Sequence, residues 1–188
     1  MMQRDHCLRI LAKHIPNEIV VAVYSAAFDW VLIRPHALNY FSVGAMGLGS
    51  SHALGLALGC PQRKIIVLDG DGSLLMNLGS VVTIGNVAPP NLYHFLCENG
   101  TYEANGEHPI PGQGKVSFTG LAKAAGYAVV HEFSDLAKFE REVPNVLAGK
   151  GPAFVNLKIV PGERRLPDYD ALYAASRRET FKEAMKRA

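Results

Sequence analysis

An acidic, glycine-rich segment is the part of this sequence whose residue types point most directly to chemistry. It reads Asp69-Gly70-Asp71-Gly72-Ser73 after an apolar stretch, and Asn99 follows a second apolar stretch 28 residues after Asp71. A carboxylate and a carboxamide supply the hard oxygen ligands that Mg²⁺ prefers, with phosphate and water completing its shell. The glycines beside Asp71 allow a diphosphate to approach the backbone closely. The spacing therefore predicts a joint site for a divalent cation and a diphosphate.

Neighbouring residues extend this predicted site. Ser73 opens an expected helix from Leu74 to Ile84, so its hydroxyl and the nearby amides would face phosphate at the positive helix end. The backbone carbonyl of Thr101 is a further oxygen ligand for the cation. The structural alternative makes Asp71-Gly72 an ordinary turn and Ser73 a helix cap. The placement of Asn99 after a second strand favours the metal site.

A second glycine-rich segment allows a different interpretation. Gly44, Gly47 and Gly49 form a GxxGxG pattern, and Asp69 lies twenty residues beyond Gly49 at an expected strand end. This is near the spacing of a dinucleotide-binding fingerprint, although the glycine order is not the usual GxGxxG. On this interpretation the protein is a nicotinamide-dependent oxidoreductase, and the Asp71 and Asn99 pair is left unexplained.

Three segments together resemble the diphosphate-binding (PP) domain of thiamine diphosphate (ThDP) enzymes, whose metal motif is a GDG triplet followed at a similar spacing by an asparagine. These segments are Gly44 to Gly49, Asp69 to Gly79 and Asn91 to Tyr102. Asp69 to Gly79 is most similar to the β subunit of sulfopyruvate decarboxylase and to the C-terminal half of phosphonopyruvate decarboxylase. The resemblance implies ThDP and Mg²⁺ as cofactors and the decarboxylation of a 2-oxo acid.

The resemblance also implies a role for individual residues. Gly44-Ala45-Met46-Gly47 resembles the GxMG segment, in which Met46 props the cofactor into a V shape and the Gly44 carbonyl accepts from its 4′-amino group. Without the resemblance, Met46 would be a core methionine filling a gap. Gly44 and Met46 are thus the expected catalytic residues, and the expected metal ligands are Asp71, Asn99 and Thr101. The full cofactor-binding set is Gly44, Met46, Gly70, Asp71, Gly72, Ser73, Asn99 and Thr101.

One catalytic group of the family has no counterpart in this interpretation. ThDP enzymes activate the cofactor with a glutamate on a separate pyrimidine-binding (PYR) domain, and 188 residues match the length of one PP domain. We therefore expect a PYR-domain α chain to complete the active site in a hetero-oligomer. The alternative is a non-catalytic or regulatory subunit that binds ThDP and Mg²⁺.

The substrate is less well defined than the cofactor. The similar decarboxylases tend to carry Tyr-Glu-Ser-Thr-Gly after the metal-binding asparagine, whereas this chain has Tyr102-Glu103-Ala104-Asn105-Gly106. Two hydroxyls suited to a sulfonate or phosphonate tail are replaced. The sequence thus predicts a 2-oxo acid substrate without fixing its tail.

Composition restricts the class of protein. With 48% hydrophobic and 19% charged residues, the chain is typical of a globular domain. A formal net charge of +2 and the lack of a block of Lys and Arg argue against nucleic acid as a partner. No stretch reaches the roughly 18 apolar residues of a membrane helix. Three scattered cysteines, Cys7, Cys60 and Cys97, predict reduced thiols in a cytoplasmic protein.

Alternating short apolar runs and helical patterns predict an α/β fold with three layers, αβα, and a mainly parallel sheet. We expect a single domain over residues 1–188 whose C-terminal helix covers 169–188. In such sheets, ligands bind beyond the carboxyl ends of the strands, where Asp71 and Asn99 both fall. The expected strands cover 19–23, 65–68, 92–97, 128–130 and 153–157, and the expected helices cover 7–15, 50–58, 74–84, 118–125 and 136–147.

Overall fold

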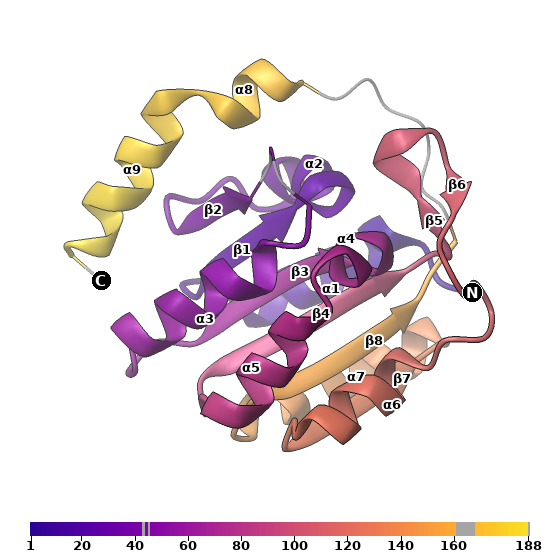
Figure 1. The fold of residues 1–188 in the computed structure, drawn as a ribbon. Coiled ribbons are helices and arrows are strands. Elements are labelled where there is room, and N and C mark those ends of the chain that lie inside the picture. Colours follow the sequence, from indigo (N-terminus) through magenta and orange to yellow (C-terminus); the bar gives the residue numbers. More distant parts are fainter. Residues whose placement is uncertain (43, 45, 161–167, 188) are drawn as a thin grey trace.

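A parallel β-sheet forms the centre of the computed structural model, which describes residues 1–42, 44, 46–160 and 168–187 (Figure 1). Its six strands lie in the order β2-β1-β3-β4-β8-β7, and each neighbouring pair is parallel. A short antiparallel pair, β5 and β6, follows β4. The bounds are β1 Ile19–Val23, β2 Asn39–Ser42, β3 Ile65–Gly70, β4 Leu92–Glu98, β5 Thr101–Tyr102, β6 His108–Pro109, β7 Val129–Phe133 and β8 Ala153–Lys158.

Helices cover both faces of this sheet, which confirms the three-layer α/β fold. One face packs against α1 Arg4–His14, α2 Tyr24–Ile33 and α7 Leu136–Ala148. The other packs against α3 Gly49–Gly59, α5 Gly79–Val87 and α6 Phe118–Ala125. Four further helical segments are the short α4 Asp71–Met76, the 3₁₀ turn η1 Glu103–Asn105, and α8 Tyr169–Tyr173 and α9 Ala175–Met185.

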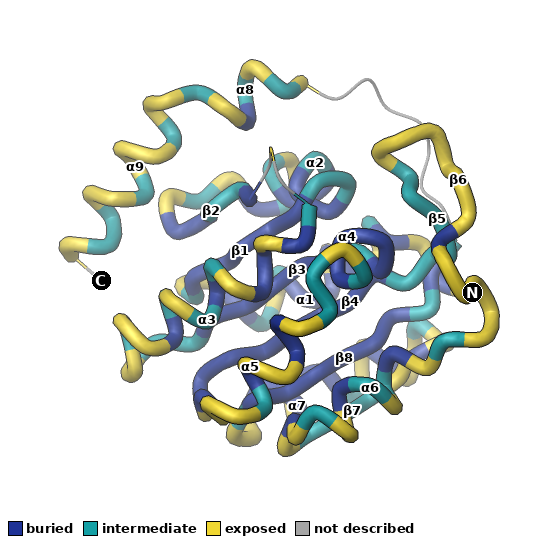
Figure 2. Tube along the Cα trace, viewed as in Figure 1, coloured by how far each residue is buried: buried dark blue, intermediate teal, exposed yellow. Residues whose placement is uncertain are grey.

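Burial on both faces explains the composition of the strands. In β1, Val20 and Ala22 face the α1 and α2 side, while Ile19 and Val21 face α3. All five residues of this strand are buried, so β-branched side chains at successive positions are favoured over an alternating polar pattern. Figure 2 shows most of the central sheet as buried and the outward sides of the helices as exposed.

The order of the strands predicts where a ligand crevice lies, namely at the carboxyl ends of β1 and β3. From β1 the chain passes to β2 on one side and then returns to β3 on the other, so the direction of winding reverses between β1 and β3. The crossover segments consequently diverge at the carboxyl ends of these two strands and leave a crevice, the usual ligand position in an open α/β sheet.

The five expected strands are all present in the main sheet, but its sixth strand, β2, and the helix α2 were not foreseen, nor were the short β5–β6 pair and η1. The chain passes directly from β1 into α2, whose mostly apolar sequence shows little amphipathic pattern. β2 is a short edge strand of only four residues, Asn39–Ser42, with polar residues at both ends. Both elements lack the periodicity on which the sequence argument depended.

Two expected helices differ from the structure. The helix predicted over 74–84 is divided, because α4 ends at Met76 and α5 begins at Gly79; between them, Asn77 turns its side-chain amide onto the Gly47 carbonyl at 3.0 Å. The helix predicted over 169–188 is also divided, into α8 and α9, because Ala174 has a non-helical backbone. Ala188 lies outside the described residues. The helix over 136–147 is continuous as α7, with Pro144 inside it.

The described helices include none that is long and apolar enough to cross a membrane. Cys7, Cys60 and Cys97 are free thiols. The assignment of the whole chain to a single domain stays a prediction.

Close contact between α5 and α6 makes Gly85 sensitive to substitution. A Cβ there would lie 1.8 Å from the Ala125 carbonyl oxygen, whereas a Cβ at Gly55, on the exposed side of α3, would meet no atom within 4 Å. We predict that Gly85→Ala lowers the free energy of unfolding by roughly 1–3 kcal/mol through overpacking. Gly55→Ala, the matched control, should raise it by about 0.5–1 kcal/mol. Urea denaturation of both variants measures this; equal effects would contradict the proposed packing.

Candidate active site

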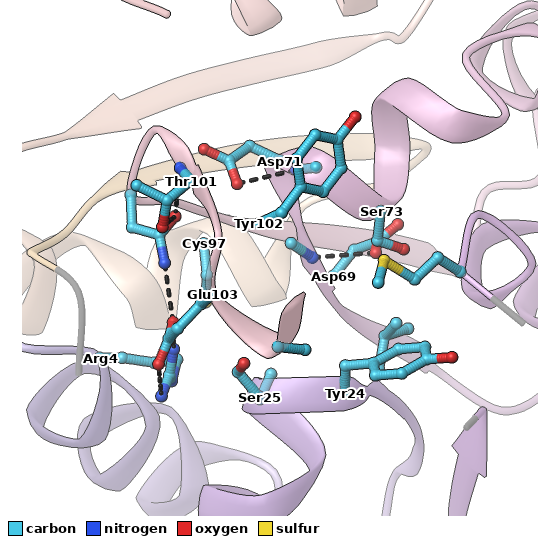
Figure 3. Close-up of a pocket in the computed structure, with 17 residues that line it drawn as sticks. Arg4, Tyr24, Ser25, Asp69, Asp71, Ser73, Cys97, Thr101, Tyr102 and Glu103 are labelled. Carbon is cyan, nitrogen blue, oxygen red and sulfur yellow. Dashed lines mark hydrogen bonds and ion pairs between the residues drawn. The ribbon is translucent and has the colours of Figure 1, made fainter. Parts of the chain in front are cut away.

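A cavity lies at the carboxyl ends of β1, β3 and β4, in the crevice where the winding direction reverses (Figure 3). It has about 420 Å³ of space, part of it open to solvent. The end of β1 and the start of α2 supply Val23 to Ala26, β3 and α4 supply Asp69 to Ser73, and the region after β4 supplies Asn99 and Thr101 to Ala104. Arg4 of α1 and Met46 line it as well, so segments distant in sequence form one site.

The structure brings together all the predicted cofactor residues except Gly44 in the lining of this cavity: Met46, Gly70, Asp71, Gly72, Ser73, Asn99 and Thr101. Gly44 is exposed and has a φ of +101°. A Cβ at Gly44 would lie 3.1 Å from the Tyr173 hydroxyl of α8. Ala45, between Gly44 and Met46, lies outside the described residues.

Asp71 joins the two halves of the metal-type motif. Its Oδ2 accepts a hydrogen bond from the Gly100 amide at 2.6 Å, and its Oδ1 accepts one from the Gly72 amide at 2.8 Å. Only 1% of Asp71 is exposed. Burial raises the pKa of the Asp71 carboxyl from its ordinary 3.8 to about 6, although both amide hydrogen bonds favour the charged form. A cation in the cavity would stabilise the ionised carboxylate.

Asn99 has hydrogen-bond partners on both sides of its carboxamide. Its Oδ1 accepts from the Thr101 amide at 2.8 Å and from the Thr101 hydroxyl at 3.1 Å. Its Nδ2 donates to Glu103 Oε2 at 2.7 Å. These contacts define the orientation of the carboxamide at the start of the β5 turn.

The glycines of the second segment have packing reasons of their own. A Cβ at Gly49 would lie 2.3 Å from Val23 in β1, and one at Gly47 would lie 2.9 Å from Asn77. Ser73 Oγ accepts from the Gly47 amide at 3.0 Å, which fixes this segment against α4. The glycine pattern is thereby explained without a dinucleotide.

Asp69 is also poorly placed for a nucleotide ribose. It is fully buried; its Oδ1 accepts from the Gly70 amide, and its Oδ2 lies 3.4 Å from Nε2 of the fully buried His94. On the other side, the His94 ring contacts the Tyr127 hydroxyl through Nδ1 at 3.2 Å. Asp69 is therefore not available to bind a ribose hydroxyl, as the nicotinamide interpretation requires.

Side chains beside Met46 complete the opposite wall of the cavity. Tyr24 lies at the junction of β1 and α2 with a φ of +41°, in the left-handed region that aromatic residues rarely occupy. Burial raises the pKa of the Tyr24 hydroxyl above its ordinary value. Backbone strain of this kind is concentrated at functional sites.

Sequence analysis missed three charged residues near this cavity. Arg4 Nε donates to Asp29 Oδ2 at 2.7 Å. The Arg4 guanidinium also makes two hydrogen bonds to the Glu103 carboxylate, and Figure 3 shows these two side chains against each other. Position 4 falls on the same helical face as Cys7, Leu8 and Leu11, all buried. A charged residue on an apolar face signals a buried ion pair, which the sequence argument did not use.

The donor set fits Mg²⁺ together with a diphosphate. Asp71 and Asn99 offer hard oxygens, while the described residues contain no cluster of three or more His, Cys, Asp or Glu side chains able to hold a metal ion. A cation there would therefore need additional oxygen ligands from a bound phosphate group. A Cβ at Gly70 would meet no atom within 4 Å, so the backbone is open to a ligand at that point.

Comparison with known proteins agrees with this geometry. Residues 21–157 match the family model described as "Thiamine pyrophosphate enzyme, C-terminal TPP binding domain". The chain is 33% identical to the sulfopyruvate decarboxylase subunit beta of Methanocaldococcus jannaschii over 184 residues, 95% of this chain and 96% of that protein. It is 40% identical to the phosphonopyruvate decarboxylase of Streptomyces viridochromogenes over 124 residues, 66% of this chain and 31% of that protein. The resemblance predicted from the sequence is confirmed.

A solved structure supports the fold independently. The structure of a putative thiamin diphosphate-dependent enzyme from Mycobacterium smegmatis aligns with a TM-score of 0.71. The alignment covers 85% of this chain and 32% of that chain, at 19% sequence identity.

Burial of Asp71 predicts a pH dependence of stability in the chain without ligands. A pKa raised from 3.8 to about 6 means that the folded protein binds this proton more tightly than the unfolded chain. The stabilising contribution is complete below about pH 4 and is lost as the pH rises through about 6. It amounts to about 3 kcal/mol, at about 1.4 kcal/mol per pKa unit.

Urea denaturation between about pH 4 and pH 7, for the wild type and Asp71→Asn, measures this contribution. A plot of the free energy of unfolding against pH should have a smaller slope for Asp71→Asn than for the wild type. The slope that remains comes from the other carboxylates, which titrate in both proteins. Identical slopes would contradict the assignment.

Proposed function

The chain belongs to the family of the C-terminal TPP-binding domain of thiamine pyrophosphate enzymes, and we propose that it is the PP-domain subunit of a ThDP- and Mg²⁺-dependent 2-oxo acid decarboxylase. Thiamine pyrophosphate and ThDP are the same compound. The observation that carries the proposal is the hydrogen bond between the Gly100 amide and Asp71 Oδ2, which brings the two halves of the metal motif together at the ligand crevice.

In the proposed site, each residue acts through its position around the cavity. Asp71 and Asn99 hold Mg²⁺ through their side-chain oxygens, and the Thr101 carbonyl is the third protein ligand. Gly70 leaves the backbone accessible to the diphosphate, while Gly72 makes room for the Tyr102 ring, which a Cβ there would approach to 2.5 Å. The Ser73 hydroxyl donates to the diphosphate while still accepting from the Gly47 amide. The positive charge of the cation would stabilise the ionised form of Asp71, which burial disfavours.

Bound ThDP supplies the nucleophilic carbon and the electron acceptor for release of carbon dioxide from a 2-oxo acid. Met46, which lines the cavity with Val23 and Tyr24, would support the bound cofactor in the bent form that the family resemblance implies. The Gly44 carbonyl would accept a hydrogen bond from the 4′-amino group of the cofactor.

The activating glutamate is proposed to come from a PYR-domain α chain. Two similar proteins are named as beta subunits of sulfopyruvate decarboxylase, and the alignments cover 89% and 96% of their length. Glu103, which lines the cavity, is held by Arg4 and is therefore not available for this purpose. The same relatives support a sulfopyruvate- or phosphonopyruvate-like substrate and the carbon–carbon lyase class. The free thiols support a cytoplasmic location.

The metal site predicts the behaviour of two variants. Asp71→Asn and Asn99→Ala should each weaken ThDP binding at least about 100-fold and remove its dependence on Mg²⁺, because a direct ligand matters more than its supporting contacts. Isothermal titration of ThDP, with and without Mg²⁺, measures the effect. Asp135→Asn is the matched control, since Asp135 caps α7 away from the cavity. Unchanged Mg²⁺-dependent binding of ThDP by Asp71→Asn would contradict the proposed site, and the nicotinamide interpretation would then have to be tested.

The proposed partner predicts a difference between the isolated chain and its natural complex. The chain purified from its own cells should carry a companion with a PYR-type sequence. The complex should release carbon dioxide from sulfopyruvate, phosphonopyruvate or pyruvate, whereas the chain alone, with ThDP and Mg²⁺, should not. Enzyme-like turnover by the chain alone would refute the split active site. A complex that binds ThDP but decarboxylates none of these acids would favour the non-catalytic alternative.

A further inference from the structure

We propose that Arg4, in the first helix, is a positioning residue of the metal site: it holds Glu103 where this carboxylate orients the side chain of Asn99. The inference rests on the proposed function, because Asn99 is a metal ligand only within it. Arg4 acts through two intervening side chains and touches neither the metal nor the cofactor in this proposal.

The contacts form a continuous chain from α2 to the metal motif. Arg4 Nε donates to Asp29 Oδ2 at 2.7 Å, and Arg4 Nη2 donates to Glu103 Oε1 at 3.0 Å. Glu103 Oε2 accepts from a second guanidinium nitrogen and also from Asn99 Nδ2, the latter at 2.7 Å. Arg4 and Glu103 are 99 residues apart in sequence, so only the fold brings them together.

Burial makes these contacts strong and costly to break. The exposed side-chain fractions are 6% for Arg4, 10% for Asp29 and 13% for Glu103. Burial lowers the pKa of Arg4, but the hydrogen bond with Glu103 and the charges of Asp29 and Glu103 raise it by more, so the guanidinium stays charged. Removing one partner from such a group leaves an uncompensated buried charge.

The carboxamide of Asn99 needs a fixed orientation, because its oxygen can bind a metal ion and its NH₂ group cannot. The Thr101 amide donates to Oδ1 from one side, and Glu103 accepts from Nδ2 on the other. Reversing the carboxamide would set NH₂ against the Thr101 N–H and Oδ1 against the Glu103 carboxylate. Glu103 therefore favours the orientation in which Oδ1, and not Nδ2, lies on the Thr101 side of the carboxamide.

A purely structural brace is the competing explanation. Asp29 by itself already supplies Arg4 with one carboxylate partner. The second carboxylate, Glu103, shares the oxygen Oε2 between Arg4 and Asn99, which a brace between α1 and η1 does not require. Supporting contacts of this kind typically change metal affinity 10- to 100-fold.

The test compares two buried arginines. Arg4→Met should raise the Mg²⁺ concentration that half-saturates ThDP binding by the full-length chain roughly 10-fold. Arg34→Met is the matched control: Arg34 is 8% exposed, binds Asn39 and two backbone carbonyls, and lies outside the cavity lining. It should lose stability without a shift in Mg²⁺ dependence. Glu103→Ala leaves the Arg4–Asp29 pair in place and should raise the half-saturating Mg²⁺ concentration by a similar factor. It provides the test if Arg4→Met folds poorly.

A second measurement does not depend on any ligand. The side-chain NH₂ resonance of Asn99, assigned by its loss in Asn99→Asp, should move in Glu103→Ala and in Arg4→Met and stay in place in Arg34→Met. Wild-type Mg²⁺ dependence in both Arg4→Met and Glu103→Ala would overturn the inference and leave the proposed function standing. Absence of Mg²⁺-dependent ThDP binding in the wild type would overturn the proposed function and this inference together.

Discussion

The fold around this site depends on one buried carboxylate that belongs to two segments at once. Asp71 begins α4 directly after β3, and its second oxygen accepts from the amide that follows Asn99 after β4. Because β3 and β4 are parallel neighbours, their carboxyl ends meet at the same edge of the sheet. Two backbone amides are modest compensation for a buried charge, and the raised pKa of Asp71 reflects the remaining cost. A bound cation would remove that cost.

Close packing holds the cavity walls in register with this carboxylate. Gly49 allows α3 to approach Val23 of β1, and the break between α4 and α5 lets Asn77 bond to the Gly47 carbonyl. Ser73 adds a bond to the Gly47 amide. The two glycine-rich segments are therefore parts of one unit, because a displacement of either breaks hydrogen bonds to the other.

Charge is distributed unevenly around the cavity. The described residues of its lining include the acidic Asp71 and Glu103 and the basic Arg4, while the Asp69 carboxylate is turned toward the Gly70 amide and His94. Arg4 is already engaged by two carboxylates, so it offers little charge to a diphosphate. On the proposed function, an Mg²⁺ ion held by Asp71 and Asn99 would lie between the carboxylates and the phosphates, since like charges otherwise repel. The metal would then make the cavity compatible with ThDP.

The sequence by itself determined the α/β class, the positions of five of the six strands of the main sheet and the family, because short β-branched runs and the Asp71–Asn99 spacing are local, one-dimensional signals. It did not determine α2 or β2, whose sequences lack a clear period, or the division at Asn77, which depends on a contact with Gly47. The metal, cofactor and partner assignments follow from the family and stay predictions at the level of single residues. Only the tertiary structure joined Arg4, Asp29 and Glu103 to the site, because contacts across 25 and 99 residues form when the fold buries those charges together.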